Sequence, residues 1–512
     1  MSFKARHLIP CSVLALLSLI IGAIIPTVMG DSNWFSAWLA SSLVVLAAAL
    51  LLYAVWRFAG STRVLGWFLA AAFMIRIAVG MLTEAGLPVW GYDETVQNSG
   101  YLFYDAYKRD NDAWALAKSD QSLLTAFENE FVGDQYGGLL SLSALVYRGL
   151  SSDLHRPYLI MLVAALAGSL AVAFVWSGAE RRWGRRVALV AAGLVAFYPD
   201  AILFGASQMR EPFLVLGTAL AFWGVVYWKI KNKYAVTSLC LSVITLLLIS
   251  FRVAIPALAV VAGWFLWDRL PKHSSRKLEL LAWVGTFIAV MLMAVLSWRW
   301  LVTSSSWDIL GTIETSGRVQ YIFESLPENL QIPFVIAYGL ARPVLPAAIV
   351  DASVPIWQAI AIYRGVGWYG IAALLVYALI IIWKAKDPVD RRILVWLSIC
   401  TIIWLLVSSA RAGGDDWDNP RYRSIFLVYI ALLCGWAWEF ARKNKDAWLG
   451  RFYLIEAIFL GFFLEWYISR YYQVIGKLPF EHMILWVAGL ALAVIIGGVV
   501  WDRIKSRRAM NG

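Results

Sequence analysis

The sequence predicts an all-α protein, a polytopic bundle of about fourteen transmembrane helices with amphipathic helices in its external loops. Composition is the first reason, because 61% of the 512 residues are hydrophobic, 15% are aromatic and only 15% are charged. A soluble domain carries about 25% charged residues. The second reason is that the apolar residues gather in runs of about 17 to 25, the length that crosses a bilayer. An ordinary soluble protein is therefore excluded.

The predicted spans follow one another along the whole chain. They lie near 9–29, 34–56, 64–83, 157–177, 187–206, 212–229, 234–251, 253–268, 279–298, 365–383, 392–410, 424–440, 452–469 and 484–501. The first run is longer than the apolar region of a signal peptide, so we interpret it as a retained anchor. The segment 332–346 is also apolar, but its prolines and Arg342 favour a re-entrant or interfacial piece.

The positive charges indicate orientation. The net charge is +11, and basic connectors such as 181–186, 229–233 and 442–451 fall on one side of the membrane when the spans alternate. By the positive-inside rule that side is the cytoplasm, and both termini lie there. Two large polar loops, about 84–156 and 299–364, then lie outside. The positive-inside rule accounts for the net positive charge, so we do not expect nucleic acid as a partner.

Neither the cysteines nor any nucleotide-binding motif indicates a functional site. The four cysteines stand inside apolar runs without a CxxC spacing, which favours core packing over disulfides or a zinc site; they are Cys11, Cys240, Cys400 and Cys434. No GxGxxG follows a strand and no GxxxxGK[ST] is present. The use of ATP or a nucleotide sugar therefore has no support.

The first external loop opens on Gly91-Tyr92-Asp93-Glu94. A carboxylate pair at the membrane surface, in a chain of lipid-soluble helices, indicates a chemical or transport role. Further along this loop two amphipathic surface helices are predicted, one around Tyr101 to Tyr107 and one from Leu123 through Phe127 to Phe131, where apolar residues recur at helical spacing.

Several motifs, taken in order, resemble the GT-C superfamily of membrane glycosyltransferases. They are the Asp-Glu pair, Gln135-Tyr136-Gly137-Gly138-Leu139-Leu140, Glu180-Arg181-Arg182-Trp183-Gly184-Arg185-Arg186, Ala196-Phe197-Tyr198-Pro199-Asp200 and Gln208-Met209-Arg210-Glu211-Pro212. The chain is most similar to the protein O-mannosyltransferases and aminoarabinose transferases. The resemblance covers mainly residues 88–255. It departs from the family in having two spans ahead of the span that leads into the Asp-Glu loop, and the second half matches only in general plan.

The resemblance implies a domain plan and an activity. Residues 1–63 would be two additional spans, 64–298 the catalytic module and 299–512 a variable C-terminal module. A polyprenyl-phosphate donor would give its sugar, with inversion, to a hydroxyl of a glycan, lipid or protein. The reaction would occur on the outer face of a bacterial cytoplasmic (inner) membrane, in cell-envelope glycan biosynthesis. It needs a base and positive charge for the departing phosphate, but no strong general acid.

The acidic candidates are Asp93, Glu94 and Glu211. Asp93 is the predicted base, and the structural alternative is a solvated loop pair or a helix cap. Glu94 would be structural or would orient the acceptor. Glu211 would position the acceptor or the base, and Arg210 would bind the donor phosphate, for which a guanidinium fork is suited. The alternative for Arg210 and Glu211 is a local ion pair that holds a turn.

Further donor-phosphate candidates are Arg252, Arg421 and Arg423. Arg252 stands between two spans and would otherwise snorkel to head groups. Arg421 and Arg423 belong to the loop 411–423, which alternatively neutralises itself with three aspartates. That loop lacks the spacing of a calcium site, so no metal ligand is assigned, no cofactor is established, and dependence on a divalent metal is left open. Arg76, inside a span, would snorkel or pair with Glu84.

Two rival functions remain open at this point. An envelope polysaccharide polymerase or ligase also uses external arginines and lipid-linked substrates, but it would take a long glycan acceptor and would not require Asp93. A transporter of lipid-linked sugars would need charged residues deep in several spans and inverted repeats. Membrane lipids are partners under every alternative.

Overall fold

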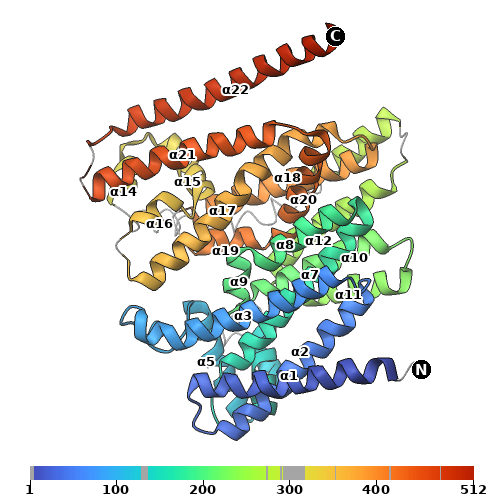
Figure 1. Ribbon diagram of the computed structural model, residues 1–512. Helices are drawn as coiled ribbons and strands as arrows, with labels where there is room; N and C mark the ends of the chain where they lie inside the picture. The colour runs from blue at the N-terminus through green and yellow to red at the C-terminus, as the bar shows by residue number, and fades with distance from the viewer. Residues whose placement is uncertain are drawn as a thin grey trace. The chain divides into compact units, whose positions relative to one another are not determined.

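A computed structural model of the chain describes residues 5–128, 137–271, 275–288, 291, 317–351, 353–413, 417–472, 474 and 476–511. Within these ranges every regular element is a helix (Figure 1). The chain divides into two compact units. Unit 1 comprises Met1–Leu296 with Ser424–Ala431, and unit 2 comprises Ser297–Arg423 with Leu432–Gly512.

The helices fit a multi-pass integral membrane protein. Among the described residues, 10 helices are long and apolar enough to cross a membrane, or up to 12 if each of two bent helix pairs is one span. The predicted number of fourteen is not confirmed. The predicted span 212–229 forms a helix of only 17 residues, Glu211–Tyr227, and much of 279–298 lies outside the described residues.

Unit 1 begins with three long helices joined by short turns. They are α1 (Ala5–Met29), α2 (Trp34–Phe58) and α3 (Arg63–Trp90). The Thr62 side chain accepts a hydrogen bond from the Leu65 amide and caps α3. Because each turn reverses the chain, α1 and α3 run in the same direction, and they contact one another.

The centre of unit 1 is α7 (Tyr158–Trp183), which packs against α2, α3, α8 (Arg185–Phe197) and α10 (Glu211–Tyr227). Small buried residues such as Ala164, Gly168 and Ala171 allow this close approach. After α8 the chain bends by 50° into α9 (Pro199–Gly205). Pro199 has no amide hydrogen, so it can begin a new helix but cannot continue the old one. The helices α11 (Asn232–Ile249) and α12 (Phe251–Arg269) pack against α10.

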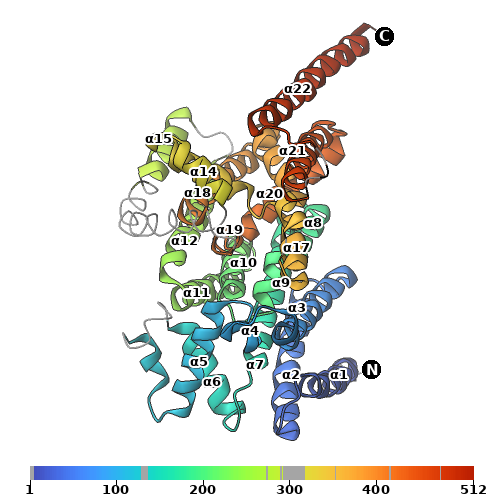
Figure 2. The same ribbon diagram turned by 90° about the vertical axis from the view of Figure 1, so that its left-hand side faces the viewer.

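The polar segment between α3 and α7 folds into short helices: α4 (Thr95–Asn98), α5 (Tyr104–Lys118), the 3₁₀ helix η1 (Leu123–Phe127) and α6 (Gly138–Leu150). Figure 2 shows α5 and α6 side by side, and they share a hydrophobic cluster that includes Leu116, Leu140 and Tyr147. The predicted helix through Leu123 is found only as η1. Its last predicted residue, Phe131, lies outside the described residues.

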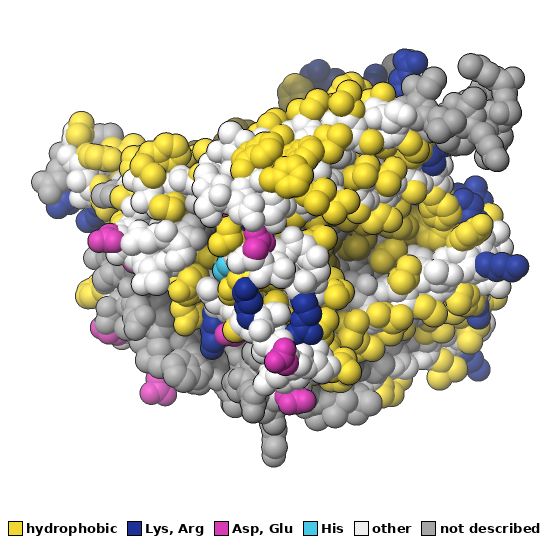
Figure 3. All heavy atoms as spheres, turned by 90° about the horizontal axis from the view of Figure 1, so that it is seen from below, with side chains coloured by type: hydrophobic (Ala, Val, Ile, Leu, Met, Phe, Trp, Pro, Cys, Tyr) yellow, Lys and Arg dark blue, Asp and Glu magenta, His cyan; other side chains and the backbone are white. Residues whose placement is uncertain are grey.

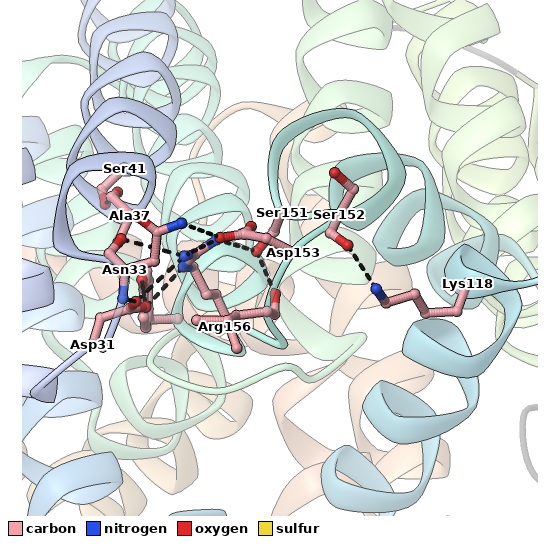
Figure 4. Close-up of polar contacts among 11 residues, drawn as sticks. Asp31, Asn33, Ala37, Ser41, Lys118, Ser151, Ser152, Asp153 and Arg156 are labelled. Atoms are coloured by element: carbon pink, nitrogen blue, oxygen red, sulfur yellow. Dashed lines mark hydrogen bonds and ion pairs between the residues drawn. The ribbon is translucent and has the colours of Figure 1, made fainter.

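A network around Arg156 ties the turn between α1 and α2 to the segment before α7 (Figure 4). The Arg156 guanidinium is buried, and it donates to Asp31 Oδ2 (2.7 Å) and to Asp153 Oδ1 (2.6 Å). The Asn33 side chain also donates to Asp153 (2.9 Å). We call these four residues the Arg156 clasp. The two N-terminal helices are therefore joined to the rest of unit 1 by polar contacts, of which the pair between Arg156 and Asp31 is buried.

Unit 2 is also helical. Its helices are α14 (Gly317–Ser325), α15 (Glu328–Ala341), α16 (Leu345–Val350), α17 (Pro355–Ile381), the 3₁₀ helix η3 (Ile382–Lys384), α18 (Pro388–Ala412), α19 (Asp418–Ser424), α20 (Leu427–Asn444), α21 (Trp448–Tyr471) and α22 (Phe480–Asn511). The stretch Ser424–Ala431, which includes the start of α20, belongs to unit 1. Within unit 2, α15 packs against α18, while α16 and α17 pack against α21.

The apolar segment 332–346 forms the end of α15 and the start of α16, with a cis peptide bond between Arg342 and Pro343. With 14 residues, α15 is shorter than the roughly 20 residues needed to cross a bilayer. Its re-entrant or interfacial position stays a prediction.

Candidate functional site

The end of α3 is built as a tight, hydrogen-bonded turn. The Tyr92 amide donates to Oε1 of Gln97 (2.7 Å), and Nε2 of Gln97 donates to Oε2 of Glu94 (3.2 Å). A Cβ atom on Gly91 would lie 2.4 Å from Oε1 of Gln97 and 2.6 Å from the Leu87 carbonyl oxygen. Only glycine therefore fits at residue 91 without displacing Gln97, which organises the turn.

Both carboxylates of this turn are exposed to solvent. Asp93 accepts a hydrogen bond at Oδ1 from Nδ2 of Asn98 (2.8 Å), so its position is defined although it faces water. Trp90 and Tyr92, on either side of Gly91, are exposed as well, with 55% of Trp90 accessible. Exposed Trp and Tyr at the end of an apolar helix are typical of the membrane–water interface. The carboxylate of Asp93 follows Trp90 by three residues.

An apolar groove with a volume of about 460 Å³ approaches the same point from the membrane-spanning part of unit 1. Residues of α1 form one wall and residues of α3 the other. The lining comprises Ile21, Ile24, Ile25, Val28, Met74, Ile77, Ala78, Met81, Leu82, Ala85, Gly86 and Trp90. The groove thus reaches Trp90, three residues before Asp93. Figure 3 shows charged side chains gathered near the middle of one face, with broad hydrophobic surface beside them.

Glu211 lies in a different environment. Its side chain is 1% exposed, and Oε1 lies 3.4 Å from Nε of Arg210. Glu211 also lines a small cavity of about 10 Å³, together with Arg76, Gly168, Val195, Ala201, Phe204, Pro212, Val215 and Ser424. Such a volume is close to the lower limit for one water molecule. Asp93 is not in this lining, and no hydrogen bond or ion pair joins these two described residues.

Arg76 neither snorkels nor forms a described ion pair with Glu84, the two alternatives that the sequence suggested. The side chain is 1% exposed, and it donates from Nη1 to the Ala196 carbonyl (3.0 Å) and from Nη2 to the Val195 carbonyl (3.2 Å). These carbonyls end α8, where the helix dipole favours a cation. A Cβ atom on Gly205 would lie 2.5 Å from Nε of Arg76, so this glycine provides the space for the guanidinium.

Sequence reasoning missed a buried cluster around Asp110. Its carboxylate is 1% exposed and accepts hydrogen bonds from the hydroxyls of Tyr101 (2.7 Å) and Tyr147 (2.6 Å). Nε2 of His155 lies 2.8 Å from Oδ2 of Asp110. Burial, and then the charge of Asp110, raise the pKa of Tyr101 well above its usual value, so this hydroxyl remains a donor. The cluster joins α5, α6 and the segment before α7.

The remaining candidates are divided between the units. Arg252 is exposed in the first turn of α12 in unit 1. Arg421 and Arg423 are buried on α19 in unit 2, where Nη1 of Arg421 lies 3.3 Å from Oδ1 of Asp418. The structure thus brings Arg210 together with Glu211, and it places Asp93 and Glu94 in one turn.

In the part of the chain that the structure describes, no group of three His, Cys, Asp or Glu side chains could hold a metal ion. Asp415 and Asp416, two of the three aspartates in the loop 411–423, lie outside the described residues. Comparisons with known proteins found no matching family model and no matching curated protein. The resemblance to GT-C enzymes therefore stays a prediction from the motifs.

Proposed function

We propose that this protein is a membrane glycosyltransferase that moves a sugar from a polyprenyl-phosphate donor to an acceptor hydroxyl, with inversion at the anomeric carbon. One observation carries the proposal: the apolar groove between α1 and α3 reaches Trp90, three residues before the exposed, hydrogen-bonded carboxylate of Asp93. A lipid-linked sugar needs both features, an apolar surface for the chain and a polar boundary for the phosphate and sugar.

The proposed reaction needs a general base, and we assign this role to Asp93. Its carboxylate would take the proton from the acceptor hydroxyl as the oxygen attacks the anomeric carbon. The bond from that carbon to the phosphate oxygen breaks, and the phosphate leaves with the electron pair on its lipid. Because the acceptor arrives from water, an exposed base is suitable, and the hydrogen bond from Asn98 would orient it.

The other site residues receive supporting roles in this proposal. Glu94 would hold the turn through Gln97. Glu211 is buried against Arg210, so it would fix that guanidinium more readily than it would meet an acceptor. Arg210 and Arg252, both in unit 1, are the proposed phosphate ligands, since a guanidinium stabilises the charge that develops on the leaving group. The phosphate-binding role of Arg421 and Arg423, in unit 2, stays a prediction from the sequence.

The test is transfer by the purified protein in lipid nanodiscs, with a panel of polyprenyl-phosphate sugars and soluble glycan acceptors. Asp93→Asn should lower kcat at least 100-fold, the usual loss when a general base is removed. Asp120→Asn is the matched control, because Asp120 is an exposed aspartate of the same segment. It should leave kcat unchanged. Equal turnover in wild type and Asp93→Asn would falsify the role of Asp93.

The same assay separates the two rivals. A polymerase or ligase would join long lipid-linked glycans, and Asp93→Asn would remain active. A transporter would move the labelled lipid-linked sugar across the bilayer of proteoliposomes without forming a new glycosidic bond. Either result would replace the present proposal.

A further inference from the structure

One end of unit 1 carries three aromatic rings that come from three helices. Phe58 is the last residue of α2, Tyr227 is the last residue of α10, and Tyr234 lies in the first turn of α11. The ring centroids of Phe58 and Tyr234 lie 5.6 Å apart. Trp223, on α10, contacts the rings of Phe58 and Tyr227, at centroid distances of 5.2 Å and 4.5 Å. We call Phe58, Tyr227 and Tyr234 the aromatic wall.

Two buried hydrogen bonds hold α11 against α10. The hydroxyl of Ser238 donates to the Leu220 carbonyl (2.8 Å), and that of Ser242 donates to the Gly217 carbonyl (2.7 Å). Hydrogen bonds of this kind join neighbouring helices where no water is present. The turn between the two helices, residues 228–231, is therefore anchored at both of its ends.

Lys231 ends this turn, and its side chain lies over the aromatic wall. Nζ is 4.9 Å from the ring centroid of Phe58 and 5.2 Å from that of Tyr227. Such cation–π contacts hold an ammonium group in place, while its N–H groups can still donate to an oxygen. The side chain of Lys231 is half-buried, and it makes no hydrogen bond or ion pair with a described residue. The ammonium is therefore positioned, with donors to spare.

Two further cations flank the aromatic wall. Arg57, at the end of α2, and Lys233, at the start of α11, are exposed, and neither forms an ion pair with a described residue. Lys229 of the same turn differs, because its Nζ lies 3.5 Å from Oδ2 of Asp268. Together with Lys231, three positive charges at the wall have no counter-charge among the described residues. This end of unit 1 is therefore suited to an anion.

The aromatic wall stands at the level expected for lipid head groups. Both α2 and α11 are long and apolar enough to cross a membrane, and the wall lies where α2 ends and α11 begins. Tyr234 is 61% exposed, and exposed tyrosines at the ends of membrane helices are typical of the membrane–water interface. The sequence also predicts that the connector 229–233 is cytoplasmic, on the side where anionic lipids give the membrane a negative surface potential.

We propose that Lys231, with Arg57 and Lys233, binds the head group of an anionic phospholipid such as phosphatidylglycerol at the aromatic wall. Nζ of Lys231 donates to the lipid phosphate, and the rings contact the glycerol and the first carbons of the acyl chains. A zwitterionic head group brings its own cation, so it gains less from the three positive charges. The site therefore selects lipids by the charge of their head group.

This lipid site is separate from the proposed catalytic site. The helix α3 begins shortly after Phe58 and ends shortly before Asp93, and its 28 residues are about 42 Å long. The aromatic wall and Asp93 thus lie near opposite ends of the same helix. The proposal goes beyond sugar transfer and does not rest on it.

The proposal is tested by native mass spectrometry of the purified full chain in detergent, which measures the affinity of each bound lipid. Dioleoyl phosphatidylglycerol and dioleoyl phosphatidylcholine are the probes, because they share their chains and their phosphate and differ in head-group charge. We expect the first phosphatidylglycerol to bind about 10-fold more tightly than the first phosphatidylcholine. Equal affinity of the two lipids would overturn the proposal.

Lys231→Gln should weaken phosphatidylglycerol binding about 5-fold and leave phosphatidylcholine binding unchanged, because it removes one cation near the membrane surface. Lys229→Gln is the matched control, since Lys229 is exposed in the same turn but pairs with Asp268. It should leave both affinities unchanged. Lys231→Arg keeps a cation beside the rings, so it should retain the preference for phosphatidylglycerol, and it also serves if Lys231→Gln does not fold.

Two further outcomes would contradict the site. An equal loss of phosphatidylglycerol affinity in Lys231→Gln and Lys229→Gln would mean that the lipid responds to the general positive charge of this end and not to the wall. Glycerol 3-phosphate carries the same phosphate without the chains. It should not displace phosphatidylglycerol when both are present at the same concentration, and displacement would assign the site to a soluble anion.

Discussion

Asn98 donates a hydrogen bond from Nδ2 to Oδ1 of Asp93 over 2.8 Å, and this contact holds the carboxylate beside the end of α3. Asn98 is the last residue of the four-residue helix α4, so the backbone of that helix fixes where the amide points. In the proposed reaction Asn98 would be a positioning residue, since it acts on the acceptor only through Asp93.

We expect Asn98→Ala to lower kcat about 10-fold, with the KM for the donor little changed, because the base loses its orientation while lipid binding remains. Asn98→Ser, which keeps a short donor, should recover part of the rate. Combining Asn98→Ala with Asp93→Asn should cost nothing beyond Asp93→Asn alone, because residues that act as a unit are not additive. Steady-state kinetics of the wild type and these four variants provide the measurement.

Ser99 offers the control for this prediction. Its hydroxyl donates to the Thr95 carbonyl within the same short segment and does not contact Asp93. Ser99→Ala should therefore leave kcat at the wild-type value. A similar loss of kcat in Asn98→Ala and Ser99→Ala would mean that kcat depends on how well the whole short segment is ordered and not on the orientation of Asp93.

The apolar groove yields a second prediction. Ala78 is exposed in the groove wall on α3, whereas Ala70 is exposed on the same helix outside the lining. A tryptophan at residue 78 would fill the space that the lipid chain is proposed to occupy. We expect Ala78→Trp to raise the KM for a long-chain donor about 10-fold, through lost apolar contact, and Ala70→Trp to leave it unchanged.

A short-chain donor separates lipid binding from general damage. If the groove holds the chain, a water-soluble donor with a short prenyl group should be used equally well by wild type and Ala78→Trp. Loss of activity with both donors would instead indicate a distorted α3, and equal KM values for the long-chain donor would remove the groove from donor binding.

Most of the long helices could be predicted because length and apolar composition decide them: lipid offers no partner for backbone groups, so a long apolar run must be helical. The length of an apolar run did not predict where its helix bends or ends. The run 187–206 reads as one span, but Pro199 divides it into α8 and α9 with a 50° bend. The run 212–229 was expected to span, yet its helix ends at Tyr227 after 17 residues.

The candidate site was less predictable, since a sequence reveals only neighbours along the chain. The Arg210–Glu211 pair was foreseen as an alternative because the two residues are adjacent. The contact of Arg76 with Ala196 joins residues 120 apart, and that of His155 with Asp110 joins residues 45 apart. Such contacts depend on how the helices pack, and periodicity carries no information about them.

The space around Arg76 gives a third prediction. A Cβ atom on Gly205 would lie 2.5 Å from Nε and 2.6 Å from Cδ of Arg76. Gly205→Ala should therefore lower stability by about 1–3 kcal/mol through overpacking, although alanine is the better helix former by about 1 kcal/mol. The apparent Tm of the purified protein is the measurement.

Gly149, on α6, is the matched control because a Cβ atom there would meet nothing within 4 Å. Gly149→Ala should leave the Tm unchanged or raise it slightly, since only the helix preference changes. Equal effects of the two substitutions would contradict the close approach of Arg76 to Gly205.

The Arg156 clasp gives the last prediction, which concerns pH. Burial raises the pKa of Asp31, but hydrogen bonds from Arg156 and Tyr158 outweigh it, so the net pKa is lowered. Hydrogen bonds from Arg156 also lower the pKa of Asp153. A lowered folded-state pKa stabilises the protein above the unfolded value, near pH 4, and the contribution is lost as the pH falls through the folded value. The clasp should therefore contribute fully from pH 8 to 5 and weaken below about pH 4.

Arg156→Met should lower stability by about 3 kcal/mol at pH 7, because removing one partner leaves the buried Asp31 uncompensated. It should also flatten the acid-side fall of the Tm. Arg148→Met is the control, since Arg148 donates to backbone carbonyls, including those of Leu116 and Ser119. That variant should lose stability equally at pH 7 and pH 4. If the Tm of Arg156→Met still falls below pH 4 as steeply as that of wild type, carboxylates outside the clasp govern the acid sensitivity of the protein.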